Sequence, residues 1–408
     1  MTGPLDGFRV LDLSSVVLGP LATQVLGDLG AEVIKIESPE GDTTRRTGPQ
    51  RSPGMAALFM GVNRNKRSVV LDLKQAAARD ALWRLIDGAD VFLHSIRPQK
   101  LDRLGFGHES VCARNPRIVY AGLHGYRTDG PYGGQPAYDD VIQGRSGSAD
   151  LMARLVGEPR YMPTIMADKT CALVAAYSVI AALLARERTG RGQFVEIPMF
   201  ETMAAFNLTE HIYGRAFDPA VAEMGYPRVL VPWRRPYPTA DGYICMLAYT
   251  DEQWRRFWRE VGRPELIDDP RFDSLKSRSD NIDEVYRTAG ECLGERTSAE
   301  WAEIFERLEI PAAPVATLEE LMEDPHLDAV GFFRRVRHPT EGGIVLTDPP
   351  VRFSDAGEDT GIRRLQPRFG EHSAEILAEA GLAEAEIAAL FASGASVDGR
   401  GNTEGEEG

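Results

Sequence analysis

The segment from Phe8 to Glu37 reads FRVLDLSSVVLGPLATQVLGDLGAEVIKIE, and it decides the fold. Its first part, Phe8 to Leu13, is an apolar and β-prone run that predicts a buried strand. Pro20 and Gly30 are placed to begin and end a helix between them. Ala31 to Glu37 is a second apolar run of strand length. The segment therefore predicts a strand, a helix and a strand, which is the repeating unit of a parallel α/β sheet.

The same alternation continues to about residue 200. Helical patterns lie between most of the later strands, for example from Gln75 to Asp87. This order is typical of a doubly wound, Rossmann-like parallel sheet, which binds ligands at the carboxyl ends of its strands. We expect the further strands at Ser68–Leu73, Ala89–His94, Arg117–Leu123 and Gln193–Met199.

The second half of the chain predicts a smaller α+β domain. A proline- and arginine-rich stretch begins near residue 226 and precedes one strand and several helical patterns. We expect a large domain over 1–225, a small domain over 226–330, a return to the large domain over 331–395 and a disordered Gly- and Glu-rich tail over 396–408.

Composition excludes several classes of protein. The 408 residues include 46 Lys and Arg against 61 Asp and Glu, a formal net charge of −15. So acidic a chain predicts no nucleic-acid partner, because phosphate neutralisation needs a dominant basic surface. No run of about 18 uninterrupted apolar residues is present, so we expect no membrane partner. Four scattered cysteines and the lack of a signal peptide predict a cytoplasmic protein with free thiols.

The motifs of common cofactor sites are missing from the sequence. Gly19-Pro20 and then Gly27 stand where a dinucleotide fingerprint needs G-x-G-x-x-G. There is no P-loop and no G-x-S-x-G elbow, and the seven histidines form no metal-binding motif. We therefore expect no metal and no tightly bound cofactor.

Asp168 opens the longest helical pattern, which runs to Arg188. An Asp in front of an apolar helix is most often an N-cap. It can also be a nucleophile, because a carboxylate is ionised at pH 7 and needs no partner base to attack a carbonyl. The residues by themselves leave both interpretations open.

A group of cations stands out in this acidic chain. Each lies near the end of a predicted strand or the start of a helix, and any one of them is typical of solvated surface charge. Together they could hold a polyphosphate ligand through charge-assisted hydrogen bonds. They are Lys66 and Arg67 in the Asn65–Ser68 turn, Lys74, Arg97, Lys100 and Arg103.

A series of motifs runs in one order from roughly residue 4 to residue 395. It comprises Leu5–Leu13, Leu26–Glu37, Asn65–Ser68, Leu71–Lys74, Leu101–Gly105, Asn115–Tyr120, Thr189–Gln193 and Gly370–His372. The series resembles class III coenzyme A transferases. Their superfamily includes formyl-CoA transferase, carnitine CoA-transferase and α-methylacyl-CoA racemase.

This resemblance implies an interlocked homodimer, each chain with a large Rossmann-like domain and a small domain. It implies a transfer of CoA from an acyl-CoA to a small carboxylic acid. Asp168 would attack the donor thioester to give a mixed anhydride, which CoA thiolate would convert into an aspartyl-CoA thioester. The acceptor carboxylate would then attack that thioester, and no metal or redox cofactor would be needed.

The resemblance also assigns the contacts to CoA. Three positions depart from formyl-CoA transferase, because Ser38 replaces an arginine, Val17 an active-site glutamine and Ala137 a lysine. These departures argue against formyl and oxalate specificity. The residues that fall where family members contact CoA are Val16, Leu71, Lys74, Ser95, Ile96, Arg97, Arg103 and Leu104.

Two alternatives to a transferase stay open. An acyl-CoA racemase or isomerase needs acid–base groups on both faces of the α-carbon. The family's racemases carry His-Asp where this chain has Tyr138-Asp139, so the usual second base is missing, and we expect Tyr138 and Asp139 to support the site around Asp168. The other alternative is a non-catalytic CoA binder, against which Asp168 and the cations argue.

The resemblance leaves the donor and acceptor acids open. Dicarboxylic substrates such as succinyl-CoA carry a second carboxylate, which needs a cation to hold it. The candidates for that role are Arg45, Arg46, Arg234 and Arg235.

Overall fold

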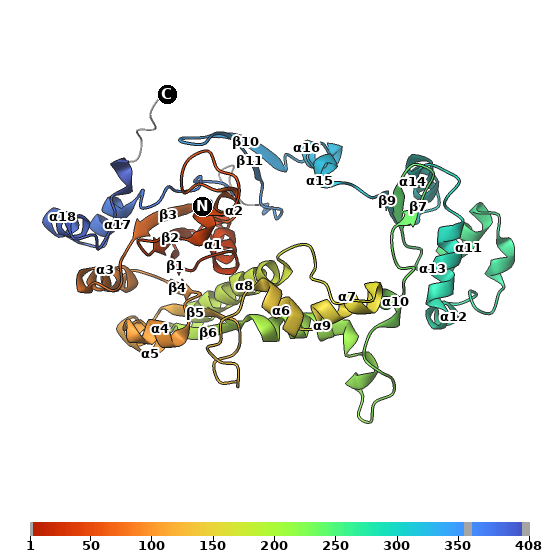
Figure 1. Ribbon diagram of the computed structural model, residues 1–408, viewed down its shortest axis with the longest axis horizontal. Coiled ribbons are helices and arrows are strands. Elements are labelled where there is room, and N and C mark those ends of the chain that lie inside the picture. Colours follow the sequence, from red (N-terminus) through yellow and green to blue (C-terminus); the bar gives the residue numbers. More distant parts are fainter. Residues whose placement is uncertain (1–2, 355–360, 402–408) are drawn as a thin grey trace. The chain divides into compact units, whose positions relative to one another are not determined.

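The computed structural model describes residues 3–354 and 361–401, and it divides into two compact units (Figure 1). Unit 1 takes the described residues up to Ser146, then Met162–Ala205 and those from Asp328 onward. Unit 2 takes Gly147–Tyr161 and Phe206–Leu327. The chain thus first enters unit 2 at Gly147, whereas the sequence placed the passage to a second domain near residue 226.

Unit 1 is built on a six-stranded sheet whose neighbouring strands are all parallel. Its order is β3-β2-β1-β4-β5-β6, which the labels of Figure 1 follow. The strands β2 and β3 follow β1 on one side of it. The strands β4, β5 and β6 then lie on the other side of β1. The prediction of an α/β fold with a parallel sheet is therefore confirmed. The strands are β1 (Arg9–Leu13), β2 (Glu32–Glu37), β3 (Lys66–Val70), β4 (Val91–His94), β5 (Val119–His124) and β6 (Gln193–Pro198).

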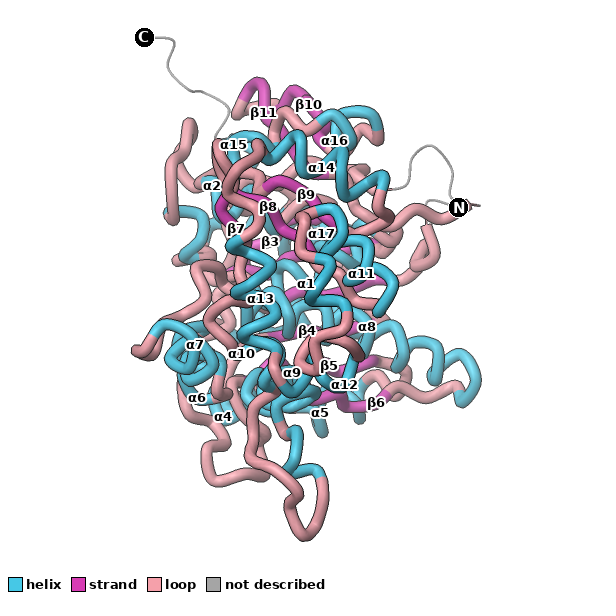
Figure 2. Tube along the Cα trace, turned by 90° about the vertical axis from the view of Figure 1, so that its right-hand side faces the viewer, coloured by secondary structure: helices cyan, strands magenta, loops and turns pink. Residues whose placement is uncertain are grey.

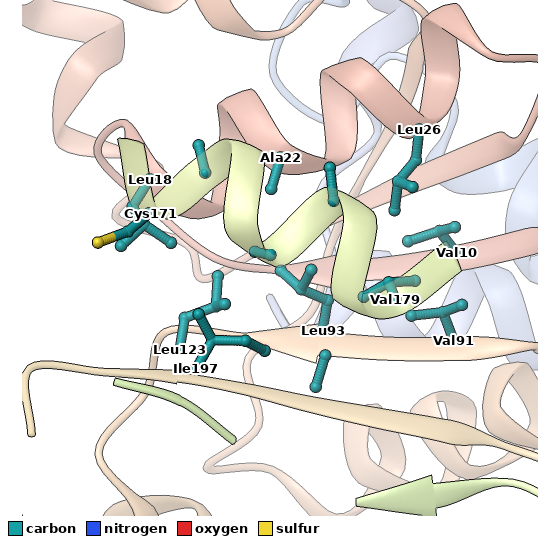
Figure 3. Close-up of a cluster of buried hydrophobic side chains, with 14 of the residues drawn as sticks. Val10, Leu18, Ala22, Leu26, Val91, Leu93, Leu123, Cys171, Val179 and Ile197 are labelled. Carbon is teal, nitrogen blue, oxygen red and sulfur yellow. The ribbon is translucent and has the colours of Figure 1, made fainter. Parts of the chain in front are cut away.

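Helices cover both faces of this sheet and bury two apolar clusters. The helix α1 (Leu18–Asp28) packs against the long helix α8 (Met166–Thr189) over one face. Figure 3 shows this cluster, which includes Leu18, Ala22 and Leu26 of α1, Cys171 and Val179 of α8, and Val10, Val91, Leu93, Leu123 and Ile197 of the strands.

The other helical elements of unit 1 connect the strands or follow the last of them. They are η1 (Thr43–Arg46), α2 (Ala57–Val62), α3 (Ala76–Asp87), α4 (Pro98–Arg103), α5 (His108–Arg114), α6 (Asp139–Arg145), α17 (Ser373–Glu379), α18 (Glu384–Ala392) and η4 (Gly399–Gly401), together with the antiparallel hairpin of β10 (Phe333–His338) and β11 (Gly342–Thr347). Two helices, α9 (Met199–His211) and α16 (Pro325–Ala329), cross a boundary between the units.

Unit 2 has a core of aromatic side chains that includes Trp254, Trp258 and Trp301. Three of its helices begin with capping boxes, in which Thr250, Thr297 and Thr317 pair with the residue three positions on. Figure 2 shows its helices in cyan and its short strands in magenta. Its elements are α7 (Ser148–Val156), η2 (Tyr213–Ala216), α10 (Pro227–Leu230), β7 (Tyr237–Pro238), β8 (Tyr243–Met246), α11 (Asp251–Glu260), η3 (Pro264–Ile267), α12 (Leu275–Asp280), α13 (Ile282–Glu291), α14 (Ser298–Arg307), β9 (Ala312–Pro314) and α15 (Leu318–Leu321).

The helix α8 is long and apolar enough to cross a membrane, judged by length and composition alone, with a mean hydropathy of 1.5. The helix contains no uninterrupted apolar run of about 18 residues, because Tyr177 and Ser178 interrupt it. Half of its most apolar window is buried within the protein. One face packs against α1, β5 and β6, so the hydropathy of α8 matches that of a core helix.

The last described residues extend the packing of unit 1. The helical pattern over 372–393 forms α17 and α18, with a break at Gly381, whose φ of +80° ends a helix readily. Ala395 and Ser396 are buried, so the chain stays packed beyond the point where the sequence predicted a disordered tail. Residues 402–408 of that predicted tail lie outside the described residues.

Candidate active site

Asp168 lies in the first turn of α8, and its side chain is buried, with only 8% of the residue exposed. The N-cap of this helix is Ile165, whose side chain caps nothing. The backbone N–H of Asp168 instead donates to Oδ1 of Asp139 over 3.0 Å. Asp139 therefore caps α8 from a different helix, and the carboxylate of Asp168 has no hydrogen-bond or ion-pair partner among the described residues.

Asp139 is itself held in place from two directions. It is the first residue of α6 and is buried. Its Oδ2 accepts a hydrogen bond of 2.6 Å from Nε2 of Gln143, one turn later in the same helix. The amide of Gln143 also reaches the segment before α8, where its Oε1 accepts from the backbone N–H of Met162 over 2.9 Å. Gln143 thus fixes Asp139 and the approach to α8 together.

Two causes raise the pKa of Asp168 to about 7. The larger is burial, which disfavours the charged form, and the smaller is the nearby charge of Asp139. Near pH 7 the carboxyl group is therefore about half protonated in the free protein. This corrects the expectation that Asp168 is fully ionised at that pH, because the expectation used the value of an exposed carboxyl group.

A cavity of about 400 Å³ opens in front of Asp168 at the carboxyl ends of β1, β4 and β5. The sheet order changes direction between β1 and β4, which is where open α/β sheets bind ligands. Its wall includes Val16, a β-branched residue with a φ of +71°, which is a strained backbone conformation. Other lining residues are Ser15, Leu18, Ser95, Ile96, Arg97, Lys100, His124, Tyr126, Ala137, Tyr138 and Met199.

A second cavity of about 430 Å³ continues from the first. The two share Ser15, Ile96 and Lys100 in their walls. The second is lined further by Ser38, Glu40, Leu71, Asp72, Lys74 and Leu104. Together they form one trough that leads from a buried carboxyl group to a polar, partly cationic end, which suits a long ligand with a reactive group at one end and anionic groups at the other.

Residues 5–373 match the family described as CoA-transferase family III. The chain belongs to CoA-transferase family III. This CoA-transferase is 34% identical to the probable fatty acyl-CoA transferase Rv3272 of Mycobacterium tuberculosis, over 92% of this chain and 98% of that protein. It is 32% identical to the succinyl-CoA:glutarate CoA-transferase of Mus musculus, over 92% of this chain and 86% of that protein.

The fold of the CoA-transferase has a match among solved structures. The crystal structure of a CAIB/BAIF family protein from Brucella suis superposes with a TM-score of 0.79 at 31% identity, and the match covers 93% of this chain and 100% of that one. The predicted resemblance to class III CoA transferases and the predicted enzyme class are thus confirmed.

The trough brings together most of the residues that the sequence assigned to CoA. Val16, Ser95 and Arg97 line the cavity of Asp168, and Leu71, Lys74 and Leu104 line the second cavity. Ile96 lines both. Arg103 is the last residue of α4 and lines neither cavity. Of the three departures, Ser38 and Ala137 lie on the trough, while Val17 is buried as the N-cap of α1.

Several cations that the sequence offered as ligand contacts are buried in ion pairs. The Lys66 ammonium lies 2.9 Å from a carboxylate oxygen of Asp12, and both side chains are fully buried. Arg67 pairs with Glu32, Glu375 and Glu379. The prediction that Lys66 and Arg67 contribute to a polyphosphate site is therefore wrong, because their charges are already neutralised by partners distant in sequence.

One of the four arginines suggested for a second carboxylate is held in a buried ion pair. Arg45 is buried and lies 2.6 Å from a carboxylate oxygen of Glu37, so that interpretation is wrong for Arg45. Arg46 donates to the carbonyl of Glu40 over 3.3 Å. Arg234 and Arg235 belong to unit 2, and the guanidinium of Arg235 lies over the ring of Trp233.

The sequence reasoning missed His124, which lines the cavity of Asp168. Its Nδ1 lies 3.2 Å from Oε1 of Glu196, and its ring leans over Gly122, where a Cβ atom would lie only 2.8 Å from Cε1 of His124. His94 lies beside it on β4, with the ring centroids 5.5 Å apart. His94 ends one predicted strand and His124 directly follows another, and these similar positions are the signal that could have found them.

Proposed function

We propose that this enzyme moves CoA from an acyl-CoA donor to a carboxylic acid acceptor through covalent intermediates on Asp168. The observation that carries the proposal is a buried carboxyl group that lines a long trough and has no partner among the described residues. Burial and Asp139 raise the pKa of Asp168 to about 7, which makes its ionised form a more basic and poorly solvated nucleophile.

The reaction balances in four steps. The Asp168 carboxylate attacks the carbonyl carbon of the donor thioester, the C–S bond breaks, and CoA leaves as a thiolate from a mixed anhydride. The thiolate attacks the aspartyl carbonyl, which expels the donor acid and leaves an aspartyl-CoA thioester. The acceptor carboxylate attacks that thioester and releases the thiolate again. The thiolate then attacks the acceptor carbonyl, which frees Asp168 and completes acceptor-CoA.

In this proposal Asp139 is a positioning residue and Tyr138 flanks the site. Asp139 fixes the first turn of α8 through the Asp168 N–H and raises the pKa of the nucleophile. Tyr138, which is 68% exposed, lines the same cavity as Asp168. A racemase would need a second acid–base group in the place of Tyr138, so we keep that reaction as the alternative outcome of the test.

Unit 1 is proposed as the CoA-binding part of the chain. The thioester end would lie by Val16, Ser95, Ile96 and Arg97, and the nucleotide end by Leu71, Lys74 and Leu104, with Arg103 beside them on α4. Cationic side chains there suit the phosphates of CoA. CoA is a substrate in this scheme, and the proposed chemistry uses neither a metal nor a tightly bound cofactor.

We also propose an interlocked homodimer in the cytoplasm, with no nucleic-acid or membrane partner. Support for the second copy comes from α8, whose outward face exposes Leu173, Tyr177 and Leu184 to the extent of 58%, 61% and 54%. These positions recur every three or four residues or a multiple of that spacing, so they form one apolar stripe opposite the core face. The molar mass in solution, before and after Tyr177→Asp, tests the dimer.

The first experiment looks for CoA on the protein itself. The enzyme is incubated with succinyl-CoA and with acetyl-CoA, quenched, and analysed by intact and peptide mass spectrometry. We expect a hydroxylamine-sensitive CoA adduct on the peptide that contains Asp168, absent from Asp168→Asn and kept in Asp140→Asn, an exposed neighbouring acid. No adduct, together with deuterium exchange at the α-carbon of a branched acyl-CoA in D₂O, would instead establish a racemase.

A further inference from the structure

The turn between β1 and α1 forms part of the wall in front of Asp168. Ser15 lines both cavities of the trough, and Val16 lines the cavity of Asp168. The φ of Val16 is +71°, and a β-branched side chain makes this left-handed conformation unfavourable. Such a conformation persists only where the surrounding structure holds it. The contacts that hold Val16 therefore determine the shape of the wall at the proposed thioester end.

The two backbone N–H groups that precede Val16 are held by side chains of the protein. The N–H of Ser14 donates to Oδ1 of Asp12 over 3.0 Å. The N–H of Ser15 donates to Oγ of Ser95 over 3.2 Å. Free N–H groups in front of a helix often bind a phosphate, but these two are already occupied. The turn therefore serves as a fixed wall of the trough, and its shape depends on the side chains that hold it.

Asp42 holds the turn at Val16 itself. Its Oδ1 accepts a hydrogen bond of 3.2 Å from the backbone N–H of Val16. The same oxygen accepts from the backbone N–H and the hydroxyl of Thr44 over 2.9 and 2.7 Å. Its Oδ2 lies 3.0 Å from Nζ of Lys35, which also donates to the carbonyl of Ser14 over 3.1 Å. Asp42 thus reaches the turn twice, once directly and once through Lys35.

Asp42 acts from within the protein. Only 4% of the residue is exposed, and Lys35 is fully buried. Asp42 lines the second cavity, but the four contacts described above occupy both of its carboxylate oxygens. Burial raises the pKa of Asp42, but the charge of Lys35 and the hydrogen bonds from Thr44 outweigh burial, so the pKa lies below its usual value. Asp42 is therefore an ionised and fixed acceptor at neutral pH.

We propose that Asp42 is a positioning residue for CoA transfer, because its carboxylate holds Val16 in the left-handed conformation and so sets the wall against which the thioester lies. The inference rests on the proposed reaction at Asp168. Without this acceptor Val16 would relax to a negative φ, and the wall would move. The thioester would then lie out of place relative to the nucleophile, and a displacement of about 1 Å can lower a rate by about 100-fold.

The test measures kcat and KM with succinyl-CoA and glutarate in the native enzyme, in Asp42→Ala and in Asp42→Asn. Asp42→Ala removes the acceptor, and we expect kcat/KM for succinyl-CoA to fall by about 10- to 100-fold. Asp42→Asn removes the charge but keeps an oxygen that can accept from the Val16 N–H, so it should stay within about threefold of the native value. Equal losses in the two variants would show that Asp42 acts only through its charge beside Lys35, and would overturn the inference.

A second substitution tests whether Asp42 acts through the backbone of Val16. Glycine adopts a positive φ about as readily as a negative one, so Val16→Gly removes the need for an acceptor that holds the turn. In the Val16→Gly background we therefore expect Asp42→Ala to lower kcat/KM by only about twofold. The same fold-loss in both backgrounds would show that the effect of Asp42 does not pass through the conformation of Val16, and would overturn the inference.

Asp28→Ala is the matched control. Asp28 belongs to α1, its carboxylate pairs with Arg64 over 2.7 Å, and it lines neither cavity of the trough. We expect this variant to unfold at a lower urea concentration and to keep the kcat/KM of the native enzyme. A loss of kcat/KM in Asp28→Ala as large as that in Asp42→Ala would mean that breaking any such ion pair slows the enzyme, and would overturn the inference.

A failure of the proposed function is distinguishable from a failure of the inference. If the native enzyme transfers no CoA and forms no adduct on Asp168, the proposed function fails, and the affinity for free CoA decides the inference instead. Calorimetric titration should then show weaker binding of CoA to Asp42→Ala than to Asp42→Asn. Equal affinities of the two variants would overturn the inference as well.

Discussion

Asp12 and Asp168 are two buried carboxyl groups of unit 1, and the charges of their neighbours differ in sign. Asp12 is fully buried on β1, where it lies 2.9 Å from Nζ of Lys66 and accepts a hydrogen bond of 2.6 Å from Thr23. Burial alone would raise its pKa, but Lys66 and Lys35 hold it well below the usual range. Asp168 is almost as buried, and the charge near it is the like charge of Asp139.

The comparison of Asp12 with Asp168 shows that burial alone does not determine whether a carboxyl group has a structural or a reactive role. The acid that meets cations becomes part of the structure, because its ion pair with Lys66 links β1 to β3, which lie on either side of β2. The acid that meets another acid keeps a reactive lone pair at a cost in stability, which is the usual relation between stability and function at an active site. The predictions below test each side of this contrast.

The largest expected effect is on catalysis. Asp168→Asn keeps the shape of the side chain and removes the nucleophile, so kcat for CoA transfer should fall on the order of 10⁴-fold or more. Steady-state rates with succinyl-CoA and glutarate measure the loss. Because the amide fits the same space, the circular dichroism spectrum should not change, and a variant that keeps more than a tenth of its activity would rule out Asp168 as the covalent carrier.

The second-largest effect is expected on stability, when the buried ion pair of Asp12 and Lys66 is broken. Lys66→Met leaves the charge of Asp12 buried without its partner and should lower the free energy of unfolding by about 3–5 kcal/mol. Urea denaturation measures this change. Adding Asp12→Asn to the same chain should recover part of the loss, since no charge is then left unpaired. If the single and the double variant are equally unstable, the loss comes from packing and not from charge.

The third effect is a gain in stability at the active site. The folded pKa of Asp168 is raised, so ionisation favours the unfolded chain as the pH rises from about 4 to about 7. Asp168→Asn removes this cost, and it should be more stable than the native enzyme by on the order of 3 kcal/mol at pH 8. Thermal melts at pH 8 and pH 4.5 measure it, and the two proteins should converge at the lower pH.

The smallest effect concerns Asp139. Asp139→Asn keeps an oxygen that can accept from the Asp168 N–H, but it removes the like charge, so it should lower the pKa of Asp168. The pH profile of kcat/KM, which should rise through about pH 7 in the native enzyme, would then rise at a lower pH. Asp140→Asn serves as the control, and equal midpoints in all three proteins would assign the raised pKa to burial alone.

The sequence determined the sheet and the family. Each of the six parallel strands appears where an apolar run predicted one, with small shifts at the ends, because hydrophobic periodicity is a local property of the chain. The motifs led to the CoA-transferase family, and with it to Asp168. The first segment of unit 2 begins at Gly147, earlier in the chain than predicted. This segment contains the helix α7, whose local sequence pattern does not show which unit it packs against.

The tertiary structure decided which charges are free. Asp12 and Lys66 are 54 positions apart, and Asp139 and Asp168 are 29 positions apart, so neither pair can be read from local spacing. In the folded chain Arg45, Lys66 and Arg67 form ion pairs and are buried. Lys100 lines the trough and has no ion-pair partner among the described residues. The reason is physical: local sequence sets the secondary structure, whereas the pKa of a group and its availability to a ligand depend on charges that only the folded chain brings within a few ångströms.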